Sequence, residues 1–342
     1  MTELYHGPSG KGPRIVALGG GTGLSTMLRG LKRYTNNITA IVTVADDGGG
    51  SGVLRQELGM LPPGDIRNCL EALANVEPLM SDLLHYRFTE GSLRGQSFGN
   101  LFLAALNGVS GSFEQAVSSM SQVLAITGRV LPVTTADVQL EAEFENGARV
   151  LGESKIFFCK KQEQCRVQRV RLVPERPKAL PQAIEAIRDA DMILLGPGSL
   201  YTSVIPNLLV DGIAEAILAS DALKIYVGNV MTQEGETEGY SHADHIRALF
   251  EHSAPGLFSH CLVNSLSIPA HVCARYASEG AEPVRVDEKA CAALGVELIA
   301  RPVSCVVDGY VRHDGQLLAA ALLEIHGGRS VRIAGAGRYS KE

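Results

Sequence analysis

The stretch Arg14-Ile-Val-Ala-Leu-Gly-Gly-Gly-Thr-Gly23 decides the fold of this chain. Its apolar run ends in glycines, which is typical of a buried strand that enters a tight turn. Four apolar residues follow at helical spacing, so one face of a helix is apolar: Leu24, Met27, Leu28 and Leu31. A second β-branched run covers residues 38–45. Strand, glycine turn, helix and strand predict a βαβ unit, and therefore a parallel sheet.

The rest of the chain continues this pattern with one interruption. Residues 51–128 are predicted to be mostly helical, and residues 130–173 alternate with period two around Asn146-Gly147, which predicts an antiparallel hairpin. From Pro181 the α/β rhythm resumes with a helix over 181–190, a strand over 192–195 and a helix from Pro206. Further strands are expected near residues 224–230, 260–264, 283–286 and 296–300. The predicted fold is α/β, a Rossmann-like, doubly wound, mostly parallel sheet with a small antiparallel β insertion.

Length and composition set the limits of the prediction. The chain has 342 residues, of which 45% are hydrophobic and 20% charged, which suits a globular protein with a full core. We expect a tail over residues 1–12, a single domain over 13–326 with the β-rich excursion at about 130–175, and a C-terminal tail over 327–342.

Charge, apolar runs and cysteines exclude several classes of protein. The net charge of −6 disfavours nucleic acid as a partner. Asp211 and Glu215 break the longest apolar run, so we expect no membrane insertion. The N-terminus lacks the apolar core of a secretory signal, and the seven cysteines form no C-x-x-C pair. These features predict a cytoplasmic protein with reduced thiols.

The first candidate site is the turn formed by Gly19, Gly20, Gly21, Thr22 and Gly23. Backbone N–H groups at a helix N-terminus attract anions, and glycines leave room for a phosphate to approach. The turn matches neither G-x-G-x-x-G nor the P-loop pattern. A purely structural turn is the alternative, but four glycines in five residues favour phosphate binding.

The second candidate site follows the next strand and consists of Asp46, Asp47, Gly48, Gly49 and Ser51. A carboxylate at this sheet edge often contacts a ribose, and two adjacent carboxylates could hold Mg²⁺ as a cofactor. A helix-capping aspartate in a glycine-rich loop is the alternative interpretation.

Two further segments complete the candidates. In Pro62-Pro-Gly-Asp-Ile-Arg-Asn68, Arg67 could bind a phosphate or carboxylate with its fork of donors, and Asp65 could serve only as an N-cap. Gly196-Pro-Gly-Ser-Leu-Tyr-Thr202 is another glycine turn after a buried strand, and suits the second part of a ligand that straddles the crevice. Its candidate ligand-binding residues are Gly196, Gly198, Ser199 and Tyr201.

No catalyst is visible beside these turns. His242 and His245 could ligate a metal but are expected at the surface, and no G-x-S-x-G elbow or activated nucleophile is present. We therefore assign no catalytic residue. Reasoning from the residues alone leads to a nucleotide-type ligand and stops there.

Several of these motifs occur together, in order, in a known family. The segments 15–25, 41–49, 63–68, Phe98-Gly-Asn-Leu101 and 196–203 resemble the gluconeogenesis factor (YvcK-type) family of the CofD-like superfamily. The resemblance covers about residues 13–326 and adds Asn68 and Asn100 to the candidate nucleotide-binding residues. CofD itself is a Mg²⁺-dependent 2-phospho-L-lactate transferase, whereas the YvcK-type branch is associated with UDP-N-acetylglucosamine.

The C-terminal part favours the YvcK-type branch. Segments 276–284 and 311–314 look like that branch, and the chain has no tryptophan, so the Gly-Trp-Gly motif of CofD is absent. The resemblance implies that Tyr276 and Arg312 belong to the UDP-sugar pocket. A tyrosine face can stack on a base or sugar, and an arginine can clamp a diphosphate.

The resemblance implies a UDP-N-acetylglucosamine-binding regulatory protein, needed for cell shape on gluconeogenic carbon sources and without turnover. A CofD-like transferase that uses Mg²⁺ held by Asp46 and Asp47 is the alternative. A related nucleotide as ligand, a homodimer, and cell-wall or cell-shape proteins as partners are compatible with the sequence and stay predictions.

Overall fold

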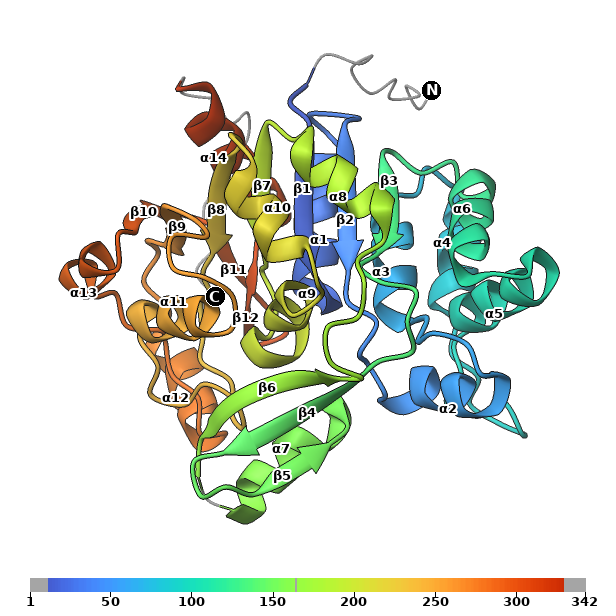
Figure 1. Ribbon diagram of the computed structural model, residues 1–342, viewed down its shortest axis with the longest axis horizontal. Coiled ribbons are helices and arrows are strands. Elements are labelled where there is room, and N and C mark those ends of the chain that lie inside the picture. The colour runs from blue at the N-terminus through green and yellow to red at the C-terminus, as the bar shows by residue number, and fades with distance from the viewer. Residues whose placement is uncertain (1–11, 164, 329–342) are drawn as a thin grey trace.

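The computed structural model describes residues 12–163 and 165–328 and has a parallel sheet of seven strands at its centre (Figure 1). The strand order is β10-β9-β8-β7-β1-β2-β3. The strands are β1 (Ile15–Gly19), β2 (Ile38–Val42), β3 (Arg129–Pro132), β7 (Met192–Leu195), β8 (Leu223–Val227), β9 (His260–Asn264) and β10 (Glu297–Arg301). The predicted fold class is confirmed.

The sheet changes its direction of growth between β1 and β7. From β1 the chain adds β2 and β3 on one side, and from β7 it adds β8, β9 and β10 on the other. The central strands β1, β2 and β7 are buried along their whole length, because helices cover both faces of the sheet. Such a reversal opens a crevice at the carboxyl ends of the two central strands.

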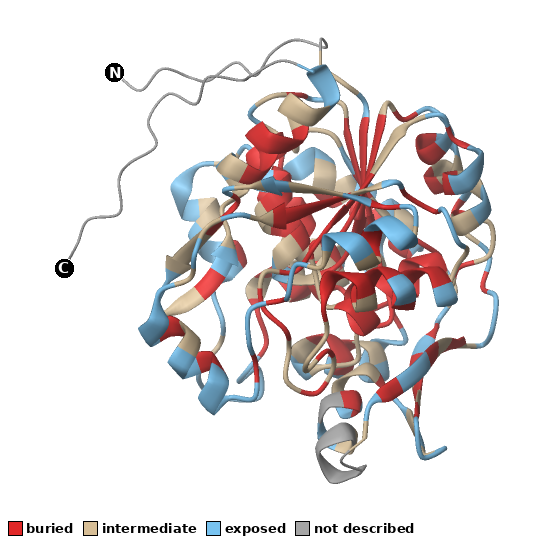
Figure 2. Cartoon of the chain, turned by 90° about the vertical axis from the view of Figure 1, so that its left-hand side faces the viewer, coloured by how far each residue is buried: buried red, intermediate tan, exposed pale blue. Residues whose placement is uncertain are grey.

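Helices form a layer on each face of the sheet. Helices α1 (Gly21–Leu31), α3 (Gly64–Leu73) and α14 (Gly315–Gly327) pack together on one face, and α8 (Pro181–Arg188), α9 (Ile205–Leu208) and α10 (Ile213–Ala219) lie on the other (Figure 1). The remaining helices outside the β insertion are α2 (Gly49–Leu58), α4 (Pro78–His85), α5 (Phe98–Ser110), α6 (Phe113–Val123), α11 (His242–Glu251), α12 (Ala270–Ser278) and α13 (Glu288–Ala293). Figure 2 shows the buried residues concentrated in the strands and on the inward faces of these helices.

The β insertion projects from the end of the sheet that carries the crevice (Figure 1). It contains β4 (Gln139–Phe144), β5 (Arg149–Leu151) and β6 (Val167–Val173), and the hairpin at Asn146-Gly147 is present as predicted. Two details differ from the prediction. The run at 129–132 pairs with β2 and extends the main sheet, and a helix, α7 (Glu153–Glu163), lies between β5 and β6.

One other expectation about the strands was wrong. Residues 283–286 form only isolated bridges, at Pro283 and Arg285. Proline lacks the backbone donor that a continuous ladder needs. A hairpin that we did not predict joins β11 (Ser304–Val307) to β12 (Tyr310–His313). Its turn residues Asp308 and Gly309 both have positive φ, at 53° and 75°, as a tight two-residue hairpin turn requires.

The helix expected from Pro206 also begins earlier than predicted. A π-helical turn, η1 (Leu200–Val204), precedes α9, so the glycine turn at 196–198 leads directly into helical structure. None of the described helices combines the length and apolar composition that crossing a bilayer requires. The predicted tails lie almost wholly outside the described residues.

A close contact between α1 and α14 yields a stability test. A Cβ on Gly30 of α1 would overlap the carbonyl oxygen of Gly315 at the start of α14. We expect Gly30→Ala to lower the free energy of unfolding by about 1–3 kcal/mol through overpacking, seen as a lower thermal midpoint. The matched control is Gly108→Ala in α5, where a Cβ meets open space and the helix propensity of alanine should raise the midpoint slightly. Equal midpoints for the two variants would contradict this account of the α1–α14 contact.

Candidate ligand site at the sheet crevice

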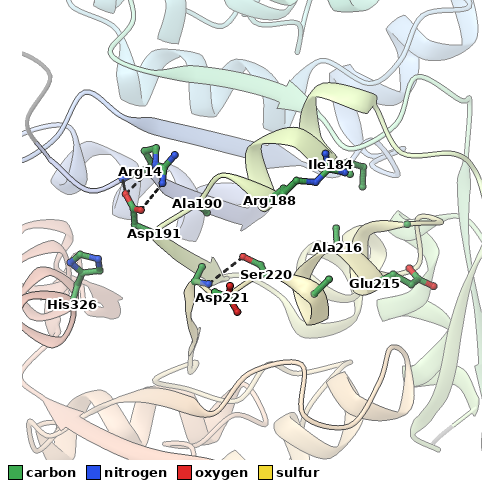
Figure 3. Close-up of a pocket in the computed structure, with 13 residues that line it drawn as sticks. Arg14, Ile184, Arg188, Ala190, Asp191, Glu215, Ala216, Ser220, Asp221 and His326 are labelled. Carbon is green, nitrogen blue, oxygen red and sulfur yellow. Dashed lines mark hydrogen bonds and ion pairs between the residues drawn. The ribbon is translucent and has the colours of Figure 1, made fainter.

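Two cavities of similar size lie at opposite ends of the central strands. One of about 810 Å³ lies at the amino ends and is bordered by the ion pair of Arg14 and Asp191, by Ser220 and by His326 (Figure 3). The other, of about 780 Å³, lies at the carboxyl ends of β1 and β7. In doubly wound sheets ligands bind at the carboxyl ends, so the second cavity, called the crevice cavity below, is the candidate site.

The floor of the crevice cavity is made by the two glycine turns in backbone contact. A Cβ on Gly23 would lie 2.8 Å from the carbonyl oxygen of Pro197, and a Cβ on Gly198 would lie 3.2 Å from that of Gly20. Gly21 has a φ of +66°, which favours glycine. The close approach of the two turns therefore requires these glycines, and they leave the floor of the cavity without side chains.

The N-terminus of α1 already faces a carboxylate. The backbone N–H of Gly21 donates a hydrogen bond to Asp65, which lies in the first turn of α3 and is not its N-cap. Burial, and then the charge of Asp46, raises the pKa of Asp65 to about 6. A phosphate at this helix end would therefore have to avoid or replace a neighbouring negative charge.

One end of the crevice cavity is acidic, and we call Asp46, Asp65 and Glu153 the acidic end. Asp46 follows β2, and Glu153 is the first residue of α7 in the β insertion. Burial, and then the charges of the carboxylates around it, Asp46 first, raise the pKa of Glu153 to about 8. Burial also raises the pKa of Asp46. Three carboxylates that resist ionisation suit hydroxyl or amide donors better than another anion.

The other end of the crevice cavity is formed by the loop after β8, by α12 and by β12. Met231, Tyr276 and Val311 belong to a small apolar cluster there, and Arg312 is exposed beside it. No carboxylate within the described part of the chain forms an ion pair with Arg312. An unpaired guanidinium at the rim can bind a phosphate with two parallel hydrogen bonds.

The structure separates the predicted site residues into two groups. Those that line the crevice cavity are Gly20, Gly21, Thr22, Gly23, Asp46, Asp65, Asn68, Gly198, Ser199, Tyr276 and Arg312. Those that lie outside its lining are Gly19, Asp47, Gly48, Gly49, Ser51, Arg67, Asn100, Gly196 and Tyr201.

Residues of the second group have contacts of their own. A carboxylate oxygen of Asp47 accepts a hydrogen bond of 2.8 Å from the backbone N–H of Ser154, which ties the β insertion to the loop after β2. Arg67 donates to Asn100 and to Glu71, at 3.1 Å and 2.8 Å. Tyr201 is 2% exposed, and its hydroxyl bonds to that of Tyr240.

The predicted Mg²⁺ pair does not fit this geometry, because Asp46 faces the cavity whereas Asp47 is bound to the insertion. Among the described residues, no three His, Cys, Asp or Glu side chains are arranged to hold a metal ion. The expectation that His242 and His245 lie at the surface was wrong. Both are buried, at 3% and 0% exposure, and burial lowers the pKa of both.

Some lining residues were not predicted. Asn229 to Gln233 follow β8, and the rule that ligand-binding loops follow the carboxyl ends of strands could have identified them. Glu153 arrives from the β insertion, and no local motif marks it. His313 comes from a hairpin that we did not predict.

The raised pKa of Glu153 yields a pH-dependent prediction. A carboxyl whose pKa is about 8 when folded and 4.5 when unfolded costs stability as the pH rises between those values. We expect Glu153→Gln to raise the thermal midpoint by roughly 2–5 °C at pH 9 and to leave it nearly unchanged at pH 4.5. Exposed Glu90→Gln is the control and should change neither midpoint. A shift of equal size at both pH values would contradict a half-buried carboxylate at position 153 that is repelled by its neighbours.

Comparisons with known proteins agree on one family. The family model of 2-phospho-L-lactate transferase CofD matches residues 15–304. A protein of Thermoanaerobacterium thermosulfurigenes is 55% identical over 312 residues, which cover 91% of this chain and 96% of that protein. The gluconeogenesis factor of Bacillus subtilis (strain 168) is 49% identical over 317 residues, covering 92% and 99% of the two chains.

The fold comparison points the same way. A crystal structure of protein BH3568 from Bacillus halodurans superposes with a TM-score of 0.88 at 48% identity, covering 92% of this chain and all of that one. The resemblance drawn from the sequence motifs is thereby confirmed. The chain belongs to the gluconeogenesis factor (YvcK-type) family of the CofD-like superfamily.

Proposed function

We propose that this protein binds UDP-N-acetylglucosamine, or a closely related nucleotide sugar, in the crevice cavity and acts as a regulator without turning the ligand over. The observation that supports this most is the division of the cavity by the N-terminus of α1. On one side lies an apolar wall with a free arginine, and on the other lies the acidic end. A nucleotide sugar has matching parts, with a flat base and a diphosphate at one end and an uncharged polyhydroxyl ring at the other.

The charges favour one orientation of such a ligand. Asp65 accepts the N–H of Gly21, so the diphosphate is better stabilised by Arg312 and by the donors of Gly198 and Ser199 than at Gly21 itself. The sugar hydroxyls would then donate to the carboxylates of the acidic end. In this orientation no anion of the ligand faces those carboxylates.

A role without turnover is consistent with the lining residues. Ser25, Thr26 and Ser199 at the cavity have no carboxylate or imidazole among their hydrogen-bond partners in the described part of the chain, whereas Thr202 donates to a carboxylate of Glu236 at 3.1 Å. The hydroxyls of Ser25 and Thr26 donate to the carbonyl of Thr22, and Ser199 accepts from Gln233. The alternative is a CofD-like transfer of a phospho-organic group. The matching family model is named after such a transferase. In that reaction a carboxylate of the acidic end could accept a proton. Product analysis after hours with ligand and Mg²⁺ separates the two, because only a transferase releases a nucleotide product.

The regulatory part of the proposal follows from the family. Relatives carry the name gluconeogenesis factor, so we propose that the ligand-bound protein acts in the cytoplasm on cell shape during growth on gluconeogenic carbon sources. A deletion strain complemented with wild type or with Arg312→Ala tests this role. Equal rescue by both would show that the cellular role does not depend on ligand binding by Arg312 in the crevice cavity.

Arg312 gives the most direct test of binding. Arg312→Ala should remove a charge-assisted hydrogen bond of roughly 1.5–3 kcal/mol and weaken UDP-N-acetylglucosamine binding about tenfold to hundredfold in calorimetry. Arg312→Lys should recover only part of the loss, because an ammonium lacks the fork. Arg247→Ala, on α11 and outside the cavity lining, is the control. Unchanged affinity in Arg312→Ala, or a flat titration of folded wild type, would contradict the proposal.

The acidic end predicts which sugars are rejected. UDP-glucuronate carries a carboxylate on its ring and should bind at least about tenfold more weakly than UDP-glucose at pH 9, because like charges repel in a partly buried site. The penalty should shrink at pH 6, where Glu153 (pKa about 8) and part of Asp65 (pKa about 6) are protonated. Glu153→Gln should reduce it at pH 9. Equal affinities for the two sugars at pH 9 would place the sugar elsewhere.

A further inference from the structure

The hydroxyl of Tyr276 holds the backbone of β12 at one residue. It accepts a hydrogen bond of 3.0 Å from the N–H of Val311 and donates one of 3.4 Å to the carbonyl of the same residue. One side chain thus provides a hydrogen-bond partner for both the N–H and the carbonyl of Val311. The next residue along the strand is Arg312.

The ring of Tyr276 has little surface to offer a ligand. The residue is 8% exposed and belongs to the apolar cluster with Met231, Val272 and Val311. Its ring meets that of Tyr310 edge to face, with centroids 5.9 Å apart. A tyrosine that stacks on a base needs an open face, and its hydroxyl would be free for the ligand.

The strand that carries Arg312 has weak support of its own. β11 and β12 form a separate two-stranded sheet outside the main one. A two-stranded hairpin is marginally stable without packing against another element. Helix α1 contacts β12, and helix α12 adds the hydrogen bonds between Tyr276 and Val311. The ring centroid of Tyr310 lies 5.5 Å from the guanidinium carbon of Arg312.

We infer that Tyr276 is a positioning residue, which fixes β12 through Val311 so that Arg312 is held at the rim of the crevice cavity. Tyr276 acts through the strand and not by stacking on the ligand. The inference rests on the proposed binding of a nucleotide diphosphate by Arg312. It makes the hydroxyl of Tyr276, more than its ring, the group on which affinity depends.

The test compares Tyr276→Phe, which keeps the ring, with Tyr310→Phe, which removes a hydroxyl from the same strand region. In the free protein, amide hydrogen exchange at Val311 should become at least about tenfold faster in Tyr276→Phe and stay unchanged in Tyr310→Phe. In calorimetry with UDP-N-acetylglucosamine, Tyr276→Phe should lose about tenfold in affinity and Tyr310→Phe little. The double variant Tyr276→Phe/Arg312→Ala should bind no more weakly than Arg312→Ala alone, since both changes remove one interaction.

Each failure has its own signature. Wild-type affinity in Tyr276→Phe together with lost affinity in Tyr276→Ala would show that the ring contacts the ligand and would overturn the inference. Additive losses in the double variant would also overturn it. If wild type does not bind the nucleotide sugar although Val311 exchange responds as expected, the proposed function fails while the contact between Tyr276 and β12 stands.

Discussion

The backbone contact between the two glycine turns is the constraint on which the crevice depends. Gly23 and Pro197 approach so closely that a Cβ on Gly23 would lie 2.8 Å from the carbonyl oxygen of Pro197. This contact brings together the ends of β1 and β7, where the sheet reverses its direction of growth. With larger residues the turns would separate, and the cavity, the start of α1 and the loop at 198–203 would lose their common floor.

The charges around that floor explain why the site is not a simple phosphate cradle. A helix N-terminus attracts anions, but here Asp65 already accepts the N–H of Gly21. Glu153, supplied by the β insertion, adds a second carboxyl whose ionisation is opposed by its surroundings. Two arginines of the lining, Arg312 on β12 and Arg29 in the last turn of α1, form no ion pair with a carboxylate in the described part of the chain. In the proposed orientation, an uncharged group of the ligand would lie at the acidic end of the cavity and a phosphate at the end that carries Arg312.

Local patterns predicted the central sheet well because its strands are short apolar runs bounded by glycine or aspartate. The strand at 260–264 agrees with the structure at both ends. The prediction failed where tertiary pairing decides, as at residues 129–132, which join the main sheet, and at residues 283–286, where proline interrupts pairing. The Asp308-Gly309 turn was a readable hairpin signal that we did not use.

The candidate site was predictable only in part, for a related reason. Glycine turns and aspartates that follow strands can be read from the sequence, because the ends of parallel strands meet at one edge. The direction of a side chain cannot be read in this way. Adjacent Asp46 and Asp47 diverge, one toward the cavity and one toward Ser154 of the insertion. Tyr201 and Arg67 likewise lie next to lining residues but bond to Tyr240 and to Glu71.

The central claim is that one nucleotide sugar occupies the crevice cavity on both sides of α1. Amide hydrogen exchange of the whole chain, with and without saturating UDP-N-acetylglucosamine, tests it most directly. The account predicts slower exchange in three separate segments, at residues 20–26, 198–203 and 311–313, and no change around Asp191 and Ser220 at the amino ends of the strands. Protection confined to the cavity at the amino ends, or to only one of the three segments, would contradict it.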